Sequence, residues 1–279
     1  QPSGKYLGED FYRAGGVSAV MNSLLAAGKL NETTITANGK TIAANYSNSP
    51  ILDKDVIRTC DDPILENAGF MILKGNICEA GVMKTSVISE NFRTQYLSKP
   101  GSKNVFEIRA IVFEGPEDYH ERINNPELNI DVDCILVIRG CGPIGYPGSA
   151  EVVNMQPPDS LIRKGILELP TLGDGRQSGT SGSPSILNVS PESAIGGGLA
   201  LLQTGDTLRI DLNRCTIDVL IDERELQKRR NLLQLNETEN QTPWQEMYRN
   251  TVGQLSGGGI IELAEKYKKI RHVIPRHSH

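Results

Sequence analysis

Short apolar segments recur along most of this chain, and glycine, proline or aspartate bounds most of them. Two clear examples are CILVIRG at 134–140 and DTLRIDL at 206–212, in which Leu208, Ile210 and Leu212 alternate with polar residues. Such segments, roughly four to eight residues long, are typical of β-strands. Further examples occupy 69–75, 81–88, 106–115, 165–175 and 216–222. The pattern predicts a β-barrel or β-sandwich core with helices packed outside it.

Helical patterns are sparse by comparison. The segment GVSAVMNSLLAAGKL at 16–30 spaces its apolar residues as an amphipathic helix requires. Another helix is predicted to begin at Asp222, because DERE places Glu225 three residues after a capping aspartate. The basic run QKRRN at 227–231 falls in that helix and is predicted to form a solvated face. Two shorter helices are predicted at 116–123 and 159–165.

Composition excludes several classes of function. With 38% hydrophobic and 23% charged residues, the 279-residue chain has the composition of an ordinary globular protein. A net charge of −5 gives no general attraction to nucleic acid or to anionic membranes, and no apolar run reaches the ~18 residues of a membrane span. The cysteines are odd in number and lack metal-site spacing, which favours free thiols in the cytoplasm; they are Cys60, Cys78, Cys134, Cys141 and Cys215.

The stretch GDGRQSGTSGSPSILN at 173–188 combines glycines with hydroxyl side chains. It has no lysine for a Walker A motif, and Ser178 stands where GxGxxG needs its third glycine. A GxSxG elbow also fails, because residue 183 is serine. Backbone N–H groups alone could still bind an anion. Because apolar segments flank the stretch, it is interpreted as a positioned loop that holds a serine for acid–base or binding chemistry.

A second stretch, RGCGPIGYPGSAEVVNMQPP at 139–158, follows a predicted strand and turns repeatedly on glycine and proline. It carries one carboxylate, Glu151, for which two interpretations stand. Glu151 could complement the dipole at a helix N-terminus, or it could be a metal or substrate ligand. Near the C-terminus, His277 and His279 lie in RHSH, which is interpreted as a polar tail.

These two stretches resemble the dihydroxy-acid dehydratase and 6-phosphogluconate dehydratase family, and within it the sugar-acid branch of L-arabinonate and D-xylonate dehydratases. GKYLGEDFYRAGG at 4–16 and PWQEMYRNTVGQLSGGG at 243–259 are similar to the same branch, so the resemblance spans nearly the whole chain. The segment QSGTSGS at 177–183 favours this branch, because dihydroxy-acid dehydratases typically carry an extra glycine there.

The resemblance implies a hydro-lyase that converts an aldonate, a 2,3-dihydroxy acid, into a 2-keto-3-deoxy acid. It implies an iron–sulfur cluster of the 2Fe–2S type as Lewis acid on the C3 hydroxyl, and Mg²⁺ at the carboxylate end of the substrate. By position, Ser178 corresponds to the base that takes the C2 proton, and Glu151 to a magnesium ligand. Thr180 and His279 correspond to substrate contacts. A serine in this role must be activated by cations or oriented donors.

The resemblance also implies the domain organisation. Residues 31–279 would form a swivelling β/β/α domain, α+β but mainly β, with a β-barrel core flanked by helices. Residues 1–30 would be the end of a preceding N-terminal domain, or a connecting helix. The cluster ligands would lie in that preceding domain, since the cysteines here do not match them. The start at Gln1 without methionine fits a C-terminal fragment, which is expected to be inactive alone.

A sugar-acid substrate and a homodimer or homotetramer are implied as partners, without nucleic acid or membrane. Two alternative functions stay open: a dihydroxy-acid dehydratase of branched-chain amino-acid synthesis, and a stand-alone swivelling domain that binds without catalysis. The joint presence of Ser178, Thr180 and Glu151 argues against the second. An aconitase-like swivelling domain shares the architecture but does not predict these loops.

Overall fold

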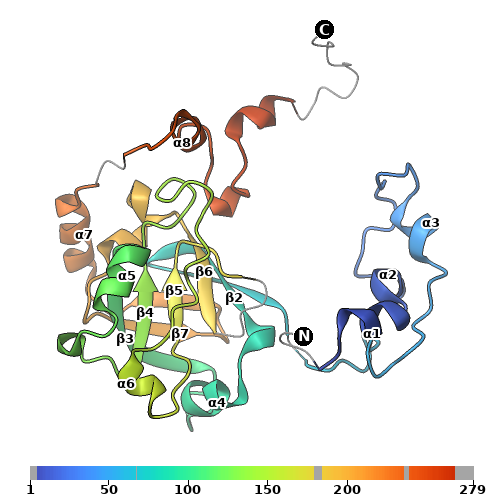
Figure 1. Cartoon of the computed structure of the whole chain (residues 1–279), viewed down its shortest axis with the longest axis horizontal. Coiled ribbons are helices and arrows are strands. Elements are labelled where there is room, and N and C mark those ends of the chain that lie inside the picture. Colours follow the sequence, from blue (N-terminus) through green and yellow to red (C-terminus); the bar gives the residue numbers. More distant parts are fainter. Residues whose placement is uncertain (1–4, 67, 179–183, 236–238, 268–279) are drawn as a thin grey trace. The chain divides into compact units, whose positions relative to one another are not determined.

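The computed structural model describes residues 5–66, 68–178, 184–235 and 239–267. Contacts divide the chain into two compact units, Gln1–Ala68 and Gly69–His279 (Figure 1). This division lies further along the chain than residue 30, after which the sequence places the start of the barrel domain. Each unit is described by itself.

The first unit consists of short helices around a small core. Its helices are α1 (Gly8–Arg13), α2 (Gly16–Ala26) and α3 (Ile42–Tyr46). The helix predicted at 16–30 is therefore confirmed as α2, although it ends earlier. Gly15 precedes α2 at φ +115°, and a Cβ there would lie 2.7 Å from the Ala19 Cβ, so only glycine fits this junction. The core of the unit is built on Ala14, Ala19 and Ile57.

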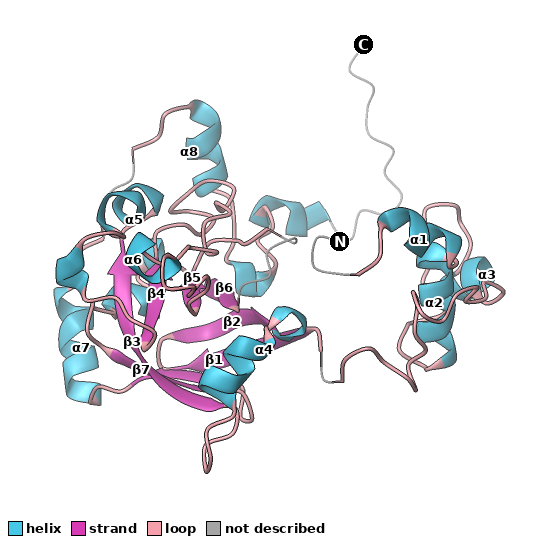
Figure 2. Cartoon of the chain, turned by 60° about the horizontal axis from the view of Figure 1, so that its bottom comes forward, coloured by secondary structure: helices cyan, strands magenta, loops and turns pink. Residues whose placement is uncertain are grey.

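The second unit is a closed barrel of mixed strands, with the order β1-β2-β6-β5-β4-β3-β7-β8 (Figure 2). Strands β3, β4, β5 and β6 are mutually parallel, whereas β1–β2, β2–β6, β3–β7 and β7–β8 pair antiparallel. The strands are β1 (Phe70–Gly75), β2 (Cys78–Lys84), β3 (Val105–Phe113), β4 (Cys134–Ile138), β5 (Thr171–Gly173), β6 (Ser185–Ser190), β7 (Thr207–Asp211) and β8 (Thr216–Val219). This confirms the predicted class, mainly β with a barrel core and flanking helices.

Helices of the second unit lie outside the barrel. They are α4 (Glu90–Phe92), α5 (Pro116–Arg122), α6 (Asp159–Ile162), α7 (Glu223–Leu232) and α8 (Pro243–Arg249), of which α5, α6 and α7 match predictions. The Asp222 carboxylate caps α7 by accepting a hydrogen bond of 2.8 Å from the Glu225 backbone N–H. Within the ranges given above, no helix combines the length and apolar character needed to cross a membrane.

The parallel part of the barrel is buried on both faces. In β3, Ile108 and Ala110 belong to the cluster that fills the barrel, whereas Ile111 and Phe113 belong to a second cluster outside it. All five residues of β4 are buried. This two-sided burial explains why the segment at 134–138 is apolar throughout instead of alternating. The outer cluster includes residues from α6 and from the chain after β4, and these elements cover this side of the barrel.

Strand β6 was not predicted from the sequence. Its segment, SILNVS, mixes serine and asparagine with apolar residues and gives no clean alternation. The strand nevertheless lies between β2 and β5, and it is buried at every position except Asn188, which is half-buried. The Ser185 hydroxyl is buried there because it accepts a hydrogen bond of 2.6 Å from the Thr171 hydroxyl of β5.

Candidate functional site

Two segments singled out in the sequence leave the same edge of the barrel. Strands β4 and β5 are parallel neighbours, with Ile138 paired to Gly173, so their carboxyl ends meet at one edge. The carboxylate loop, residues 139–158, follows β4, and the serine segment, residues 174–178, follows β5. Parallel strands bring such segments together because their ends point the same way.

Backbone hydrogen bonds join the carboxylate loop to the serine segment. The Arg176 N–H donates to the Ala150 carbonyl at 2.8 Å, and the Val153 N–H donates to the Arg176 carbonyl at 3.1 Å. Glu151 therefore lies beside Arg176, which is two residues before Ser178. The two segments that the sequence picked out independently are neighbours in the folded unit.

A buried carboxylate, Asp174, fastens the start of both segments. Asp174 is fully buried, and its Oδ1 accepts from the Cys141 N–H at 2.9 Å. Its Oδ2 accepts from the Gly140 N–H at 3.1 Å, and from the N–H and hydroxyl of Ser193 at 2.9 and 2.6 Å. Four hydrogen bonds to one carboxylate compensate for its burial and hold the first turn of the carboxylate loop.

A second buried carboxylate, Glu192, holds the middle of the carboxylate loop. It is fully buried and accepts from the Ile144 N–H at 3.0 Å and the Gly145 N–H at 2.8 Å. The Gln254 side chain donates to it at 2.8 Å, which ties the C-terminal part of the unit to the loop. A Cβ at Gly142 would lie 2.6 Å from the Glu192 carboxylate, so the loop needs glycine there.

Glu151 differs from these anchors because its side chain is 49% exposed. Its carboxylate lies 3.4 Å from the Arg176 guanidinium, an exposed ion pair that contributes little to stability. Glu151 also lines a cavity of about 280 Å³ together with Tyr119, His120 and Asn154. The carboxylate is therefore accessible as a ligand and is not occupied in holding the fold.

Ser178 is half-buried at the end of the serine segment. The preceding residue, Gln177, is buried and donates to the Ser185 hydroxyl at 2.5 Å, which fixes the segment against β6. The Lys84 ammonium, from the end of β2, donates to the Ser178 carbonyl at 3.4 Å.

Three residues singled out in the sequence, Thr180, His277 and His279, lie outside the described residues. Sequence reasoning missed Lys84, Asp174 and Glu192, whose partners come from distant segments.

Three buried thiols of the barrel unit lie in environments that do not fit an iron–sulfur cluster. Burial raises the pKa of Cys78 to about 12 and of Cys134 to about 11, and it raises the pKa of Cys141 as well. A cluster is bound by thiolates, which these environments disfavour. Across the residues that the structure describes, no group of three or more His, Cys, Asp and Glu side chains could hold a metal ion. For Mg²⁺, Glu151 offers a single carboxylate, which is not a complete site.

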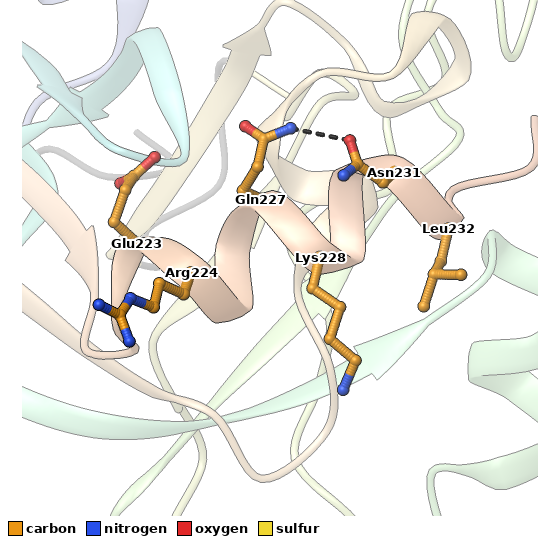
Figure 3. Close-up of a pocket in the computed structure, with 6 residues that line it drawn as sticks. All are labelled: Glu223, Arg224, Gln227, Lys228, Asn231 and Leu232. Atoms are coloured by element: carbon orange, nitrogen blue, oxygen red, sulfur yellow. Dashed lines mark hydrogen bonds between the residues drawn. The ribbon is translucent and has the colours of Figure 1, made fainter.

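A larger hollow, of about 660 Å³, lies along the outer face of α7. Figure 3 shows its lining, in which the Gln227 amide donates to Asn231 at 2.9 Å while Lys228 points away from this pair. Every residue that lines it belongs to this one helix, namely Glu223, Arg224, Gln227, Lys228, Asn231 and Leu232. Active sites converge polar groups from several elements, so this hollow is a surface feature of α7.

Comparison with known proteins identifies the class of this barrel. Residues 55–259 match the family model described as dihydroxy-acid/6-phosphogluconate dehydratase C-terminal, and residues 1–45 match the corresponding N-terminal model. The chain belongs to the dihydroxy-acid/6-phosphogluconate dehydratase family. Dehydratases of this family generally use an iron–sulfur cluster.

The relatives place the chain in the sugar-acid branch. It is 57% identical to D-xylonate dehydratase of Caulobacter vibrioides over 279 residues, which are 100% of this chain and 47% of the relative. It is 39% identical to L-arabonate dehydratase of Azospirillum brasilense, and 37% identical to L-arabinonate dehydratase of Rhizobium leguminosarum; each match covers 82% of this chain and 38% of the relative. The chain thus spans about half, or less, of the length of these curated relatives.

Proposed function

We propose that this chain is the C-terminal part of a sugar-acid dehydratase, which converts an aldonate into a 2-keto-3-deoxy acid. The observation that carries the proposal is the meeting of the carboxylate loop and the serine segment at one barrel edge, joined through Arg176. The identities to D-xylonate and L-arabinonate dehydratases support an aldonate as the substrate.

In this proposal Ser178 is the base. Its alkoxide takes the proton from C2 of the substrate, and the C2–H electron pair forms the C2–C3 double bond as the C3–O bond breaks. The departing C3 hydroxide takes that proton from the Ser178 hydroxyl, so that water leaves and the alkoxide is restored. The resulting enol then tautomerises to the 2-keto acid. A serine can act in this way only if its oxygen is held in place and its negative charge is stabilised. The hydrogen bond from the Gln177 amide to the Ser185 hydroxyl supports the positioning of the neighbouring Ser178.

The other groups of the site are assigned by the same proposal. Glu151 supplies one oxygen ligand to Mg²⁺, while Thr180 and His279 contact the substrate. An iron–sulfur cluster of the 2Fe–2S type, held outside this chain, supplies Lewis-acid assistance to the departing hydroxyl when bound. Residues 1–30 belong to the end of the N-terminal domain or to a connecting helix, which the N-terminal family match at 1–45 supports. The whole enzyme assembles as a dimer or tetramer.

Replacing the base tests this assignment in the full-length enzyme, prepared without oxygen. Ser178→Ala should lower kcat on D-xylonate or L-arabinonate by about 10²–10⁴-fold, the usual contribution of a positioned base. The visible absorption of the cluster should not change, because Ser178 is not a cluster ligand. Ser160→Ala, at an exposed position on α6, serves as the matched control and should retain activity. Unchanged turnover in Ser178→Ala would rule out its role as base.

The second part of the proposal concerns the 279-residue chain alone. It should form no 2-keto product from any pentonate, because in this proposal the ligands of the cluster lie outside it. Robust turnover by the isolated chain would contradict this. A substrate panel on the full-length enzyme distinguishes a sugar-acid dehydratase from a dihydroxy-acid dehydratase. Preference for a branched-chain dihydroxy acid over aldonates would favour the enzyme of branched-chain amino-acid synthesis.

A further inference from the structure

Lys84 is a buried lysine at the edge of the barrel where the serine segment lies. Lys84 is the last residue of β2, and it is only 9% exposed. The adjacent residues, Met83 and Thr85, are also buried, at 1% and 7% exposure. Lysine is almost never buried to this degree in proteins without a compensating interaction.

The strand pairing explains why Lys84 meets the serine segment. Strand β2 runs antiparallel to β6, with Met83 paired to Ile186, so the end of β2 lies beside the start of β6. The chain enters β6 directly after the region that contains Ser178. The Lys84 ammonium thereby reaches the Ser178 carbonyl oxygen at 3.4 Å, a contact between residues 94 positions apart.

Hydrogen bonds also hold the backbone of Thr85, the residue that follows Lys84. The Thr85 N–H donates to the Gly69 carbonyl at 2.9 Å, and the Arg93 guanidinium donates to the Thr85 carbonyl at 3.3 Å. Burial lowers the pKa of Lys84 because removal from water disfavours the ammonium form. An anion that forms beside this ammonium would offset that cost, and by the same interaction the ammonium would stabilise the anion.

We propose that Lys84 is a positioning residue for Ser178, which holds the Ser178 main chain and stabilises the alkoxide form of its hydroxyl. This inference rests on the proposed function, in which that alkoxide removes the C2 proton. Lys84 stays protonated throughout: the C2 proton passes to the Ser178 oxygen, and the C2–H electron pair forms the new double bond. The lysine thus supplies part of the positive potential that a serine base requires.

The test uses the full-length enzyme with an aldonate and with the same aldonate deuterated at C2. Lys84→Met keeps the length of the side chain and removes its charge, so kcat should fall about 10²-fold, as when an oriented donor is removed from an active site. KM should change little, and the deuterium isotope effect on kcat should increase because proton removal becomes slower. Lys84→Arg keeps the charge and should recover most of the lost rate.

Lys74→Met is the matched control, since Lys74 is an exposed lysine on the neighbouring strand β1, and this variant should behave as wild type. Cluster absorption and the thermal unfolding midpoint report whether each variant is folded. If Lys84→Met does not fold, Lys84→Gln replaces it as a polar, neutral variant with the same expected kinetics.

Three results would overturn the inference. The first is an unchanged kcat and isotope effect in the neutral variant. The second is a raised KM with unchanged kcat, which assigns the ammonium to uniform substrate binding. The third is an equal decrease of kcat in the neutral and the arginine variants with no change in the isotope effect. This result would indicate that the role of Lys84 is purely structural. A wild-type enzyme that does not dehydrate aldonates would instead refute the proposed function, so the two failures are distinguishable.

Discussion

At the scale of single residues, the candidate site depends on carboxylates that take no part in the proposed chemistry. Glu192 is fully buried and receives hydrogen bonds from two backbone N–H groups of the carboxylate loop and from Gln254. These donors are satisfied by an acceptor that carries a full negative charge. The position of the carboxylate loop therefore depends on Glu192, which lies 48 positions after Ile144 in the sequence.

Glu192→Gln should destabilise the 279-residue chain by about 2–3 kcal/mol, because hydrogen bonds to a charged group are replaced and the new amide N–H groups face other donors. Urea denaturation of the chain measures this free energy of unfolding. Glu246→Gln changes an exposed glutamate of α8 and should stay within about 0.5 kcal/mol of wild type. Equal stabilities of the two variants would contradict the anchoring role of Glu192.

At the scale of elements, α7 shows how local and non-local signals combine. Its start was predicted correctly from the capping pattern at Asp222. The basic run at 227–231 is only partly a solvated face: Lys228 is exposed, but Arg229 turns inward to Asp206 at 2.6 Å and its side chain is 12% exposed. The prediction for Arg229 was wrong because Asp206, at the barrel, is not visible in the periodicity of the helix.

The cap of α7 can be tested directly. Asp222→Ala should lower the free energy of unfolding by about 1 kcal/mol, because the Glu225 N–H loses its acceptor at the helix start. Asp222→Asn should keep nearly all of the stability, since an amide oxygen also caps well. Chemical denaturation compares the variants, and an equal loss in both would show that the charge of Asp222 matters and not its hydrogen bond.

At the scale of the whole molecule, three buried thiols of the barrel unit couple its stability to alkaline pH. Cys78 lies in the cluster inside the barrel, whereas Cys134 and Cys141 lie in the cluster outside it. Burial raises the pKa of Cys78 from 9.0 to about 12, with a further contribution from the charge of Asp218. A raised folded-state pKa means that the stabilising contribution is complete below the unfolded-state value and is lost as pH rises toward the folded-state value.

The free energy of unfolding should therefore decrease between pH 9.0 and about 12, as the unfolded thiols ionise first. Cys78→Ala should show a shallower decrease over this interval than wild type, because the buried thiol is removed. Urea titrations at a series of pH values measure the slopes. The same slope in wild type and in Cys78→Ala would show that the Cys78 thiol ionises equally in both states.

The sequence alone determined the features that depend on local chemistry. Apolar runs and alternation predicted most of the barrel strands, including β4 and β7, and the capping pattern at Asp222 predicted the start of α7. The motifs around Ser178 and Glu151 supported the family, which the comparisons confirm. The roles of Ser178 and Glu151 stay predictions, as do those of Thr180 and His279.

Only the tertiary structure decided which residues surround these motifs. Lys84, Asp174 and Glu192 carry charged side chains, and their burial becomes possible only through partners on other segments. Strand β6 mixes polar and apolar residues, and only the fold places it between β2 and β5. Lys84 and its partner Ser178 are 94 positions apart in the sequence, and Glu192 and its partner Gln254 are 62 positions apart. Periodicity reports on near neighbours along the chain, whereas the free energy of burying a charge depends on neighbours in space, which only the tertiary fold brings together.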